Sequence, residues 1–391
     1  MKLLVVGLGQ CGGRIADEFA RLNRKARSQR GMDIITGAFA VNADIADLSG
    51  LTRIKSDYQH RILIGSRKTG GHGVGKINEL GAEIAKEDAD KVVDAIRTTK
   101  QLTEADAFLL IAGAAGGTGS GAIPILTQHI KERFADKPVY DLIILPFERE
   151  EETEERTIYN AATCLKSTYL VADAVILVDN QRYIVRESSI GSNLSKINEL
   201  IAKPFYNLLC AGEEKNPKFI GAKLLDAGDI IQTLVGWTTI SYSESHISLL
   251  KFLFERTRDF RKRAGETQKG TQAMDDAMGR LSLKCSPADS KRALYLITAP
   301  AREMSVDLIK ELGVHLKNLA PDAIIRSGDY PRERSSLDVA VILSELSDVA
   351  KVRDYFAKTL NLISTMQKRQ EGIESERIGI DISLKDIPSL L

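Results

Sequence analysis

The sequence predicts an α/β fold with a mostly parallel sheet that is covered by helices on both faces. Three observations support this prediction. Short apolar runs alternate with helix-like stretches through the first 180 residues. Glycine-rich segments directly follow two of these runs. A second, shorter alternation begins near residue 293. Nearly continuous apolar strands separated by helices are typical of parallel sheets.

The first half of the chain provides the large sheet. Its apolar runs predict strands at 2–6, 37–41, 61–64, 107–111, 139–145 and 174–178, and helices at 14–26, 77–98, 123–134 and 154–169 between them. Ligands of such sheets bind at the carboxyl ends of the strands. The glycine-rich loops of this chain all follow strands, so we expect them to meet at that edge.

The second half predicts a long helix and then a smaller α/β unit. Ser192 or Asn193 can cap a helix that runs to about Cys210 and is kinked at Pro204. The elements that follow are a helix at 226–235, a strand at 237–242, an irregular or helical region at 245–290, a strand at 293–298, a helix at 305–319, strands at 323–326 and 338–343, and a helix at 348–360.

These elements predict four parts. They are an N-terminal nucleotide domain (1–190), a central connecting helix (191–212), a smaller C-terminal α/β domain (213–365) and a charged tail (366–391).

The composition excludes several classes of protein. A net charge of +1 gives no field for binding nucleic acid or an anionic membrane surface. No apolar run approaches the roughly 18 residues of a membrane span, and Leu3–Val6 is too short for a signal peptide. The four cysteines and five histidines lack metal-ligand spacing. We therefore expect a cytoplasmic protein with reduced thiols and no metal site of its own.

The most informative motif is the glycine-rich segment 113–121, Gly-Ala-Ala-Gly-Gly-Thr-Gly-Ser-Gly, between a strand and a helix. Glycines let backbone N–H groups converge on an anion, and a helix N-terminus adds partial positive charge. This loop therefore predicts phosphate binding. The segment 70–76 is a third glycine cluster. Ile77 stands where a P-loop needs Ser or Thr, so the cluster is not a P-loop, and the sequence leaves two interpretations, a flexible loop beside the phosphates and a mobile surface loop.

The segment 7–12 reads G-x-G-x-x-G directly after the first strand and completes a Rossmann-like arrangement. This pattern raises one alternative from another class, an NAD(P)-dependent oxidoreductase. Such a fold places a ribose-binding acid about 20 residues further on, whereas the second strand ends some 30 residues past Gly12, at Val41-Asn42-Ala43-Asp44. It also has no use for a second, richer glycine loop.

Taken together, the loops closely resemble those of the tubulin/FtsZ superfamily. Segment 115–121 matches its signature of a small residue followed by G-G-T-G-S-G, and 9–13 resembles its first nucleotide loop with the tubulin-like Gln-Cys. Segment 41–44 resembles the Asn-Thr-Asp loop of FtsZ. The similarity covers most of residues 1–365, and the Gln-Cys pair on an FtsZ-like body is most similar to the archaeal CetZ branch.

The resemblance implies binding of GTP or GDP with Mg²⁺, and a set of residues that contact the nucleotide. From the loops these are Gly9, Gln10, Cys11, Gly12, Gly13, Arg14, Asn42, Gly73, Gly113, Ala114, Ala115, Gly116, Gly117, Thr118 and Gly119.

Four further residues acquire roles from the same resemblance. Asn180 and Asn198 match asparagines that contact guanine or ribose, and Glu152 and Arg156 match a glutamate–arginine pair near ribose and phosphates. Family members place an aromatic ring four residues before the second asparagine, where this chain has Leu194. Without the family, segment 148–156 would be a solvated helix start with an i,i+4 ion pair.

The catalytic residues implied by the resemblance are Asp226 and Asp229. From sequence alone, two acids at i and i+3 predict a helix cap. In the family this pattern completes GTP hydrolysis on the neighbouring subunit. Family members usually have Asn two residues before the first acid, and here Leu224 stands there. A site divided between two ends of the molecule requires head-to-tail self-association into an open filament.

The resemblance thus implies a slow, assembly-dependent GTPase of the cytoskeleton, with cell-shape control in the CetZ manner ahead of cell division in the FtsZ manner. Residues 251–272 fall where tubulin-like proteins make sidewise contacts between protofilaments. The end of the chain, 385–391, resembles the FtsZ peptide that binds membrane tethers and so implies membrane-proximal filaments.

Overall fold

The computed structural model describes residues 1–184, 190–246, 260–333 and 336–363. Within these residues the strands are β1 (Leu3–Leu8), β2 (Ile35–Asn42), β3 (Arg61–Leu63), β4 (Ala107–Gly113), β5 (Val139–Leu145), β6 (Ala174–Asp179), β7 (Gly236–His246), β8 (Ser290–Ala299), β9 (Ile324–Pro331) and β10 (Ser336–Leu346).

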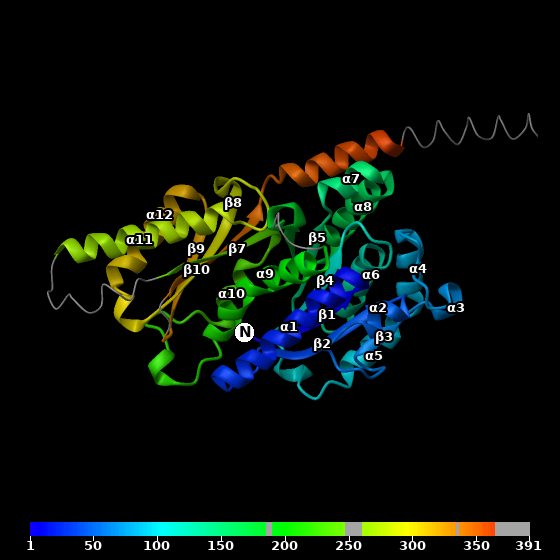
Figure 1. The fold of residues 1–391 in the computed structure, drawn as a ribbon, viewed down its shortest axis with the longest axis horizontal. Coiled ribbons are helices and arrows are strands. Elements are labelled where there is room, and N and C mark those ends of the chain that lie inside the picture. The colour runs from blue at the N-terminus through cyan, green and yellow to red at the C-terminus, as the bar shows by residue number, and fades with distance from the viewer. Residues whose placement is uncertain (185–189, 247–259, 334–335, 364–391) are drawn as a thin grey trace, which may run out of the picture.

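These strands form one sheet in the order β3-β2-β1-β4-β5-β6-β7-β10-β8-β9 (Figure 1). All neighbours from β3 to β7 are parallel. On the other side of β7, β10 runs antiparallel to both β7 and β8, and β8 and β9 are again parallel. The predicted fold class, an α/β fold with a mostly parallel sheet and a second, smaller unit, is confirmed.

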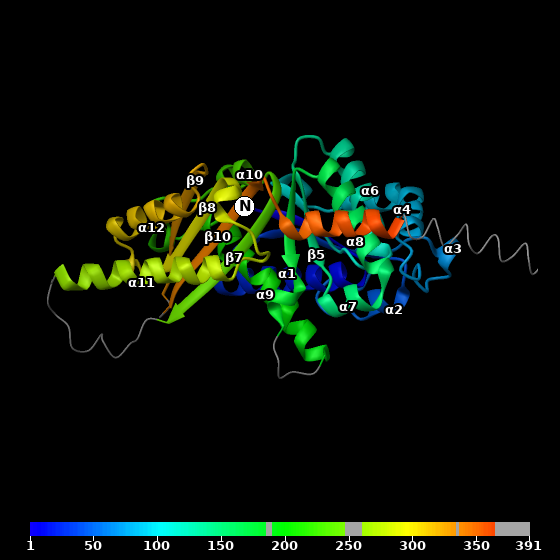
Figure 2. The same cartoon turned by 90° about the horizontal axis from the view of Figure 1, so that it is seen from above.

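Helices cover both faces of the sheet, as the two views in Figures 1 and 2 show. Their bounds are α1 (Gly9–Arg30), α2 (Ile45–Ser49), α3 (Ser66–Thr69), α4 (Asn78–Glu87), α5 (Ala89–Arg97), α6 (Thr118–Arg133), α7 (Glu148–Thr153), α8 (Glu155–Val171), α9 (Ile190–Ala211), α10 (Ala227–Thr233), α11 (Phe260–Gly279), α12 (Val306–Leu319) and a last helix at 350–363.

The apolar core is divided into two clusters, one on each face of the sheet. The first cluster takes side chains from α4, α5, α6, α8, α11, α12 and the last helix. The second cluster takes side chains from α1, α9 and α10. Alternate residues of β1 supply the two clusters, with Leu4 and Val6 in the first and Leu3 and Val5 in the second.

Two helices begin earlier than predicted, inside the glycine motifs. We expected helices from 14 and 123, but α1 begins at Gly9 and α6 at Thr118. Close packing explains why glycines stand in these first turns. A Cβ on Gly12 would lie 1.9 Å from the carbonyl oxygen of Ile111, and one on Gly119 would lie 2.7 Å from that of Leu8. Backbone contact, rather than a loose turn, requires glycine there.

The single helix predicted at 77–98 is wrong. The segment forms α4 and α5, which are separated at Asp88, whose backbone is not helical (φ −102°, ψ 12°). The carboxylate of Asp88 accepts a hydrogen bond of 2.7 Å from the backbone N–H of Gly65, after β3. A tertiary contact therefore interrupts a pattern that looks continuous in the sequence.

Other boundaries shift by smaller amounts. α9 begins at Ile190, before the predicted caps, and the side chain of Ser192 lies outside the described residues. Within the region 245–290, β7 extends to His246 and α11 occupies 260–279. Residues 247–259, which hold part of the predicted lateral contact, and the tail 366–391 also lie outside them.

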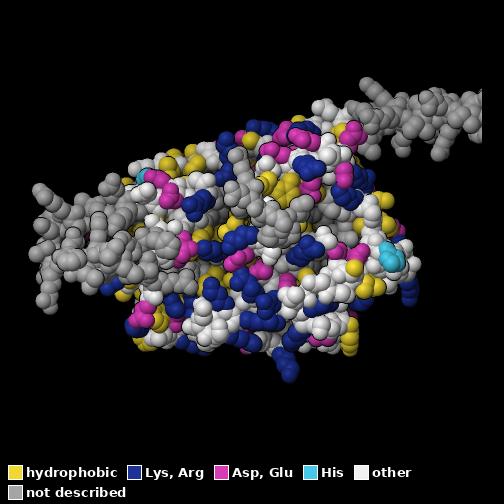
Figure 3. All heavy atoms as spheres, in the orientation of Figure 1, with side chains coloured by type: hydrophobic (Ala, Val, Ile, Leu, Met, Phe, Trp, Pro, Cys, Tyr) yellow, Lys and Arg dark blue, Asp and Glu magenta, His cyan; other side chains and the backbone are white. Residues whose placement is uncertain are grey.

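The surface carries both signs of charge. In Figure 3, basic and acidic side chains are interspersed over the face shown, in keeping with the net charge of +1. None of the helices in the described ranges is long and apolar enough to cross a membrane.

Candidate functional site

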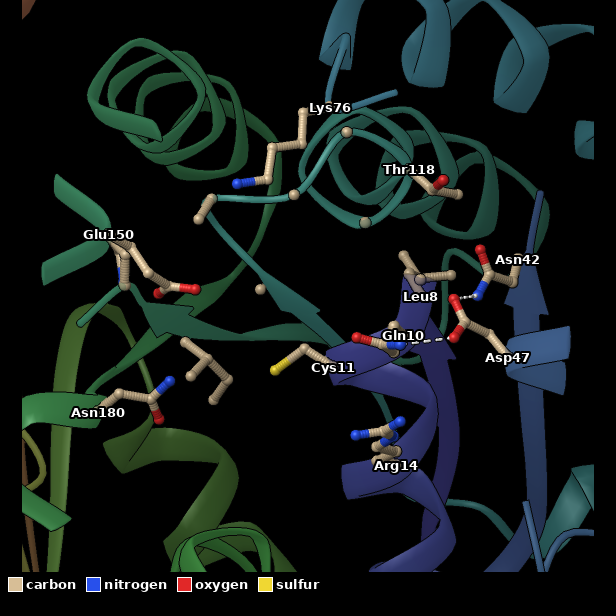
Figure 4. Close-up of a pocket in the computed structure, with 18 of the residues that line it drawn as sticks. Leu8, Gln10, Cys11, Arg14, Asn42, Asp47, Lys76, Thr118, Glu150 and Asn180 are labelled. Carbon is tan, nitrogen blue, oxygen red and sulfur yellow. Dashed lines mark hydrogen bonds between the residues drawn. The ribbon is translucent and has the colours of Figure 1, made fainter. Parts of the chain in front are cut away.

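A cavity of about 360 Å³ lies at the carboxyl edge of the parallel strands (Figure 4). Its lining comes from the loops that follow β1, β2, β4, β5 and β6, from loop 70–77 and from α9. This is the place where parallel α/β sheets bind ligands, because the turns after neighbouring strands converge there. The volume suits a small molecule.

Two helix N-termini meet at this cavity without a capping side chain. α1 starts after Leu8, α6 starts after Gly117, and neither has a side-chain cap or an acidic residue in its first turn. Their first backbone N–H groups therefore keep their hydrogen-bonding capacity, and both helix dipoles point a positive end at the cavity. Together they form a site for an anion with several oxygens.

One wall of the cavity is a fixed network of polar side chains. Asp47 accepts hydrogen bonds from Gln10 Nε2 at 2.6 Å and from Asn42 Nδ2 at 3.0 Å. The Asn42 oxygen accepts in turn from the backbone N–H of Ala43 at 2.8 Å. Asp44 caps α2 through the backbone N–H groups of Ala46 and Asp47. Gln10 and Asn42 are thus held by these bonds before any ligand arrives.

Cys11 and Glu150 face the same space from opposite sides, as Figure 4 shows. Burial raises the pKa of the Cys11 thiol to about 12, with a further rise from Glu150 and an opposing effect of Arg14. Because the thiolate is the nucleophilic form, this shift disfavours reactivity of the Cys11 thiol. Glu150 is anchored because its carboxylate accepts from the backbone N–H of Phe147 at 3.0 Å.

Another part of the lining combines amide groups with apolar side chains. Asn180 and Asn198 line it together with Phe147, Leu194 and Ile197. The Asn180 Oδ1 atom is buried and has no hydrogen-bond partner among the described residues. Because an orphaned buried acceptor is costly, this atom is suited to receive a hydrogen bond from a ligand.

The structure brings most of the predicted binding residues together. The lining contains Gly9, Gln10, Cys11, Arg14, Asn42, Gly73, Gly113, Ala115, Gly116, Gly117, Thr118, Gly119, Asn180 and Asn198.

Five predicted residues do not line the cavity. Gly12, Gly13 and Ala114 are buried behind it, where they pack against the backbone and side chains of the sheet and its helices. Glu152 lines a separate hollow beside the last helix. Arg156 is drawn away by an ion pair with Glu79 on α4. Direct ligand contacts of these five residues stay a prediction.

Sequence reasoning missed several residues of the lining. Asp47, Phe147 and Glu150 belong to it, and so do Asp44 and Lys76, which lie in the predicted segments 41–44 and 70–76 but were not named as contacts. Asp47 and Glu150 sit in short helices just after a strand, which is a detectable signal, because side chains at such positions face the carboxyl edge. Lys76 closes a glycine cluster with a left-handed backbone (φ 62°), which its sequence neighbours do not reveal.

The two predicted catalytic acids lie at the other end of the sheet. α10 leads into β7, whose first residue, Gly236, pairs with Ala174 at the amino end of β6. In Figures 1 and 2, α10 lies beside the N-terminus, where β1 begins. Asp226 is exposed and accepts from the backbone N–H of Asp229 at 2.8 Å. Asp229 forms an ion pair of 3.4 Å with Arg326.

The chain matches two family models that together span most of its length. Residues 2–185 match the GTPase domain of the Tubulin/FtsZ family, and residues 187–361 match the C-terminal domain of tubulin-like CetZ. The chain is 34% identical to the tubulin-like protein CetZ1 of Haloferax volcanii over 90% of each chain.

Solved structures of CetZ proteins have the same fold as this chain. A GDP-bound monomer of Haloferax volcanii CetZ1 superposes with a TM-score of 0.79 at 31% identity, covering 93% of this chain and 99% of that one. A GTPγS-bound protofilament of CetZ2 from the same organism superposes with a TM-score of 0.81 at 27% identity, covering 94% and 100%.

Proposed function

This chain belongs to the tubulin/FtsZ family, in its tubulin-like CetZ branch, and from that premise we propose that it binds GTP and GDP and assembles head to tail. The observation that carries the proposal is the division of the chemistry between the two ends of one sheet. The anion-binding helix N-termini lie at the carboxyl edge, and the exposed acids of α10 lie at the amino edge.

The cavity accounts for nucleotide binding. The phosphates would lie against the amides of the glycine loop and the N-termini of α1 and α6. The guanine would lie between the apolar side chains and the amides of Asn180 and Asn198, and Phe147 provides an aromatic ring although Leu194 does not. GDP and GTPγS are bound by the related CetZ1 and CetZ2 structures.

Magnesium would be held chiefly by the phosphates and by water, as is usual for nucleotide-bound Mg²⁺. Within the described ranges there is no group of three His, Cys, Asp or Glu residues that could hold a metal. The polar wall offers the side-chain oxygens of Gln10, Asn42 and Asp47, which could bind the ion or its water molecules. The ion would neutralise charge on the triphosphate during the reaction.

Hydrolysis would take place only between subunits. Asp226 and Asp229 of one copy would orient and polarise the water that attacks the terminal phosphate held by the next copy. Because the two halves lie on opposite ends, repeated contact produces a filament rather than a closed ring. Activity would be slow in isolated molecules. The filament would act in cell shape; a role in cell division is the alternative.

A ligand screen tests the nucleotide proposal. Thermal unfolding is measured with GTP, GDP, NAD and NADP, each with Mg²⁺. A ligand that binds only the folded protein raises the midpoint in a concentration-dependent manner. We expect stabilisation by GTP and GDP and none by NAD or NADP. Stabilisation by NAD or NADP alone would contradict the proposal and favour an oxidoreductase. Negative-stain microscopy with and without GTP then tests for filaments.

A further inference from the structure

One buried amide joins two loops of the nucleotide cavity. Asn160 lies on α8 and is fully buried. Its Nδ2 atom lies within hydrogen-bond distance of three backbone carbonyl oxygens, 2.9 Å from that of Lys76, 3.0 Å from that of Ala115 and 3.2 Å from that of Gly116. Since a carbonyl oxygen can only accept, the orientation of this amide group is fixed by its surroundings.

This contact helps to fix where the neighbouring N–H groups point, together with a hydrogen bond from the Ser120 hydroxyl to the Gly116 carbonyl. In a planar trans peptide the C=O of one residue and the N–H of the next point in opposite directions. The carbonyls of Ala115 and Gly116 point toward Asn160 on α8, so the N–H groups of Gly116 and Gly117 point away from α8. Both residues line the cavity.

We propose that Asn160 is a positioning residue that presets the phosphate-facing amides of the glycine loop and locks loop 70–77 to it. This rests on the proposed nucleotide binding. The third contact, to the Lys76 carbonyl, holds the end of loop 70–77 against the glycine loop. The two loops also touch directly, because a Cβ on Gly117 would lie 2.5 Å from Val74 and 2.9 Å from the Ile77 nitrogen. A loop held in this way loses little freedom when the nucleotide binds.

Two substitutions separate positioning from packing. Asn160→Asp keeps the size of the side chain but replaces the NH₂ group, which donates to the three carbonyls, with an oxygen that can only accept. Asn160→Ala removes the donor and leaves a small void. Thr163→Val is the matched control. Thr163 lies one turn along α8 and accepts a hydrogen bond of 2.8 Å from Asn78, the residue that follows loop 70–77, so the change removes a partly buried contact of similar kind that does not reach the glycine loop.

The measurement is the GDP dissociation constant by calorimetry, with circular dichroism to verify folding and a thermal unfolding midpoint without nucleotide. We expect GDP to bind about tenfold more weakly to Asn160→Ala, and more weakly still to Asn160→Asp, with Thr163→Val within about twofold of the parent. If volume alone mattered, the Asp variant would bind like the parent and only Ala would lose affinity.

Three results are decisive. Parent-like affinity of either folded Asn160 variant overturns the inference, and so does an equal loss in Thr163→Val. If Asn160→Asp fails to fold, the Ala and Thr163→Val pair alone decides. Failure of the parent chain to bind GDP would contradict the proposed function itself, and is thus distinguishable from failure of the positioning role.

Discussion

The two ends of the sheet are built on different principles. At the carboxyl edge, backbone groups of the glycine loop and of two helix N-termini face the cavity together with polar and apolar side chains, and several of the glycines pack closely against neighbouring backbone. At the amino edge, the groups of interest are two side chains near the surface, and each already has a structural partner. Asp226 caps α10 and Asp229 contacts Arg326. The carboxyl edge has uncapped helix N-termini that can bind a ligand. At the amino edge, one acid stabilises the start of α10 and the other contacts Arg326.

Under the proposed function, this difference would let one chain hold a nucleotide that it hydrolyses only slowly by itself. Asp226 and Asp229 lie at the amino end of the parallel strands and the cavity lies at the carboxyl end, so the length of the strands separates them. In the segment before Asp226, Leu224 and Ile220 are 46% and 43% exposed. Exposed apolar side chains near the two proposed catalytic acids suit burial against another molecule. The amino edge therefore has the character of a docking surface, and the carboxyl edge that of a binding site.

The largest expected effect comes from Asp226→Asn. Asparagine caps helices as well as aspartate does, so α10 remains stable while the charge is lost. We expect GTP turnover to fall about a hundredfold or more, because a residue that orients the attacking water contributes about that much. GTP affinity is expected to remain within about twofold, since the acid lies far from the cavity of its own chain.

The control for this change is Asp307→Asn, which alters an exposed acid in the first turn of α12. Steady-state turnover and calorimetric GTP affinity are measured on all three proteins at one concentration. Unchanged turnover in Asp226→Asn, or a loss shared with Asp307→Asn, would remove the amino edge from the reaction.

A smaller effect is expected from Gly117→Ala at the other end. The added methyl group would press on Val74 and on the backbone between Lys76 and Ile77. We expect the free energy of unfolding without nucleotide to fall by about 1–3 kcal/mol. Gly116→Ala is the matched control, because its Cβ would meet nothing within 4 Å, and a change of less than about 0.5 kcal/mol is expected. Denaturant unfolding measures both, and equal losses would contradict the backbone packing described for this edge.

Lys76→Asn tests how the cavity distinguishes its ligands. Lys76 lines the cavity along the glycine loop (Figure 4) and forms an exposed ion pair with Glu154, which is easily exchanged. Asn tolerates the left-handed backbone at this position. We expect affinity for GTPγS to fall about five- to tenfold, because a charged contact to the added phosphate is lost.

GDP affinity of Lys76→Asn should stay within about twofold, since GDP lacks that phosphate. Lys68→Asn, which changes an exposed lysine on α3 that pairs with Glu83 and Glu87, is the control. Equal losses for GDP and GTPγS would show that Lys76 does not distinguish the two.

The smallest expected effect is on stability and concerns the role of Asp226 as the N-cap of α10. Asp226→Ala removes the side chain that accepts from Asp229, whereas Asp226→Asn keeps an acceptor. We expect Asp226→Ala to lower the free energy of unfolding by about 1 kcal/mol relative to Asp226→Asn. Denaturant unfolding of the two variants measures this. Equal stability would mean that α10 does not depend on the cap.

The sequence predicted the strands of the first half well because most are nearly continuous apolar runs with few competing interpretations. The strand predicted at 323–326 is β9, which continues to Pro331 through polar residues that gave no such signal. The prediction failed where tertiary contacts override local preference. The starts of α1 and α6 were placed too late, since glycine disfavours helices unless close backbone packing requires it, as at Gly12 and Gly119. The break at Asp88 depends on Gly65, 23 residues earlier, and no local pattern encodes that contact.

The glycine-rich motifs correctly predicted where the cavity lies, because glycines mark places where the backbone forms a tight turn or approaches other backbone closely. Side chains that reach it from outside the motifs were less predictable. Glu150 enters the lining while Glu152, two residues later on α7, faces a different hollow. The orientation of α7 determines which of the two glutamates faces the cavity. Asn160 was not singled out, since an asparagine in a helix becomes informative only once its three carbonyl partners are known.

The most direct test of the divided site is GTP turnover per molecule as a function of protein concentration, with the size of the particles followed by light scattering. We expect the rate per molecule to rise steeply once filaments form and to fall toward zero in dilute solutions of single molecules. A rate per molecule that stays the same in solutions shown to contain only monomers would contradict the account.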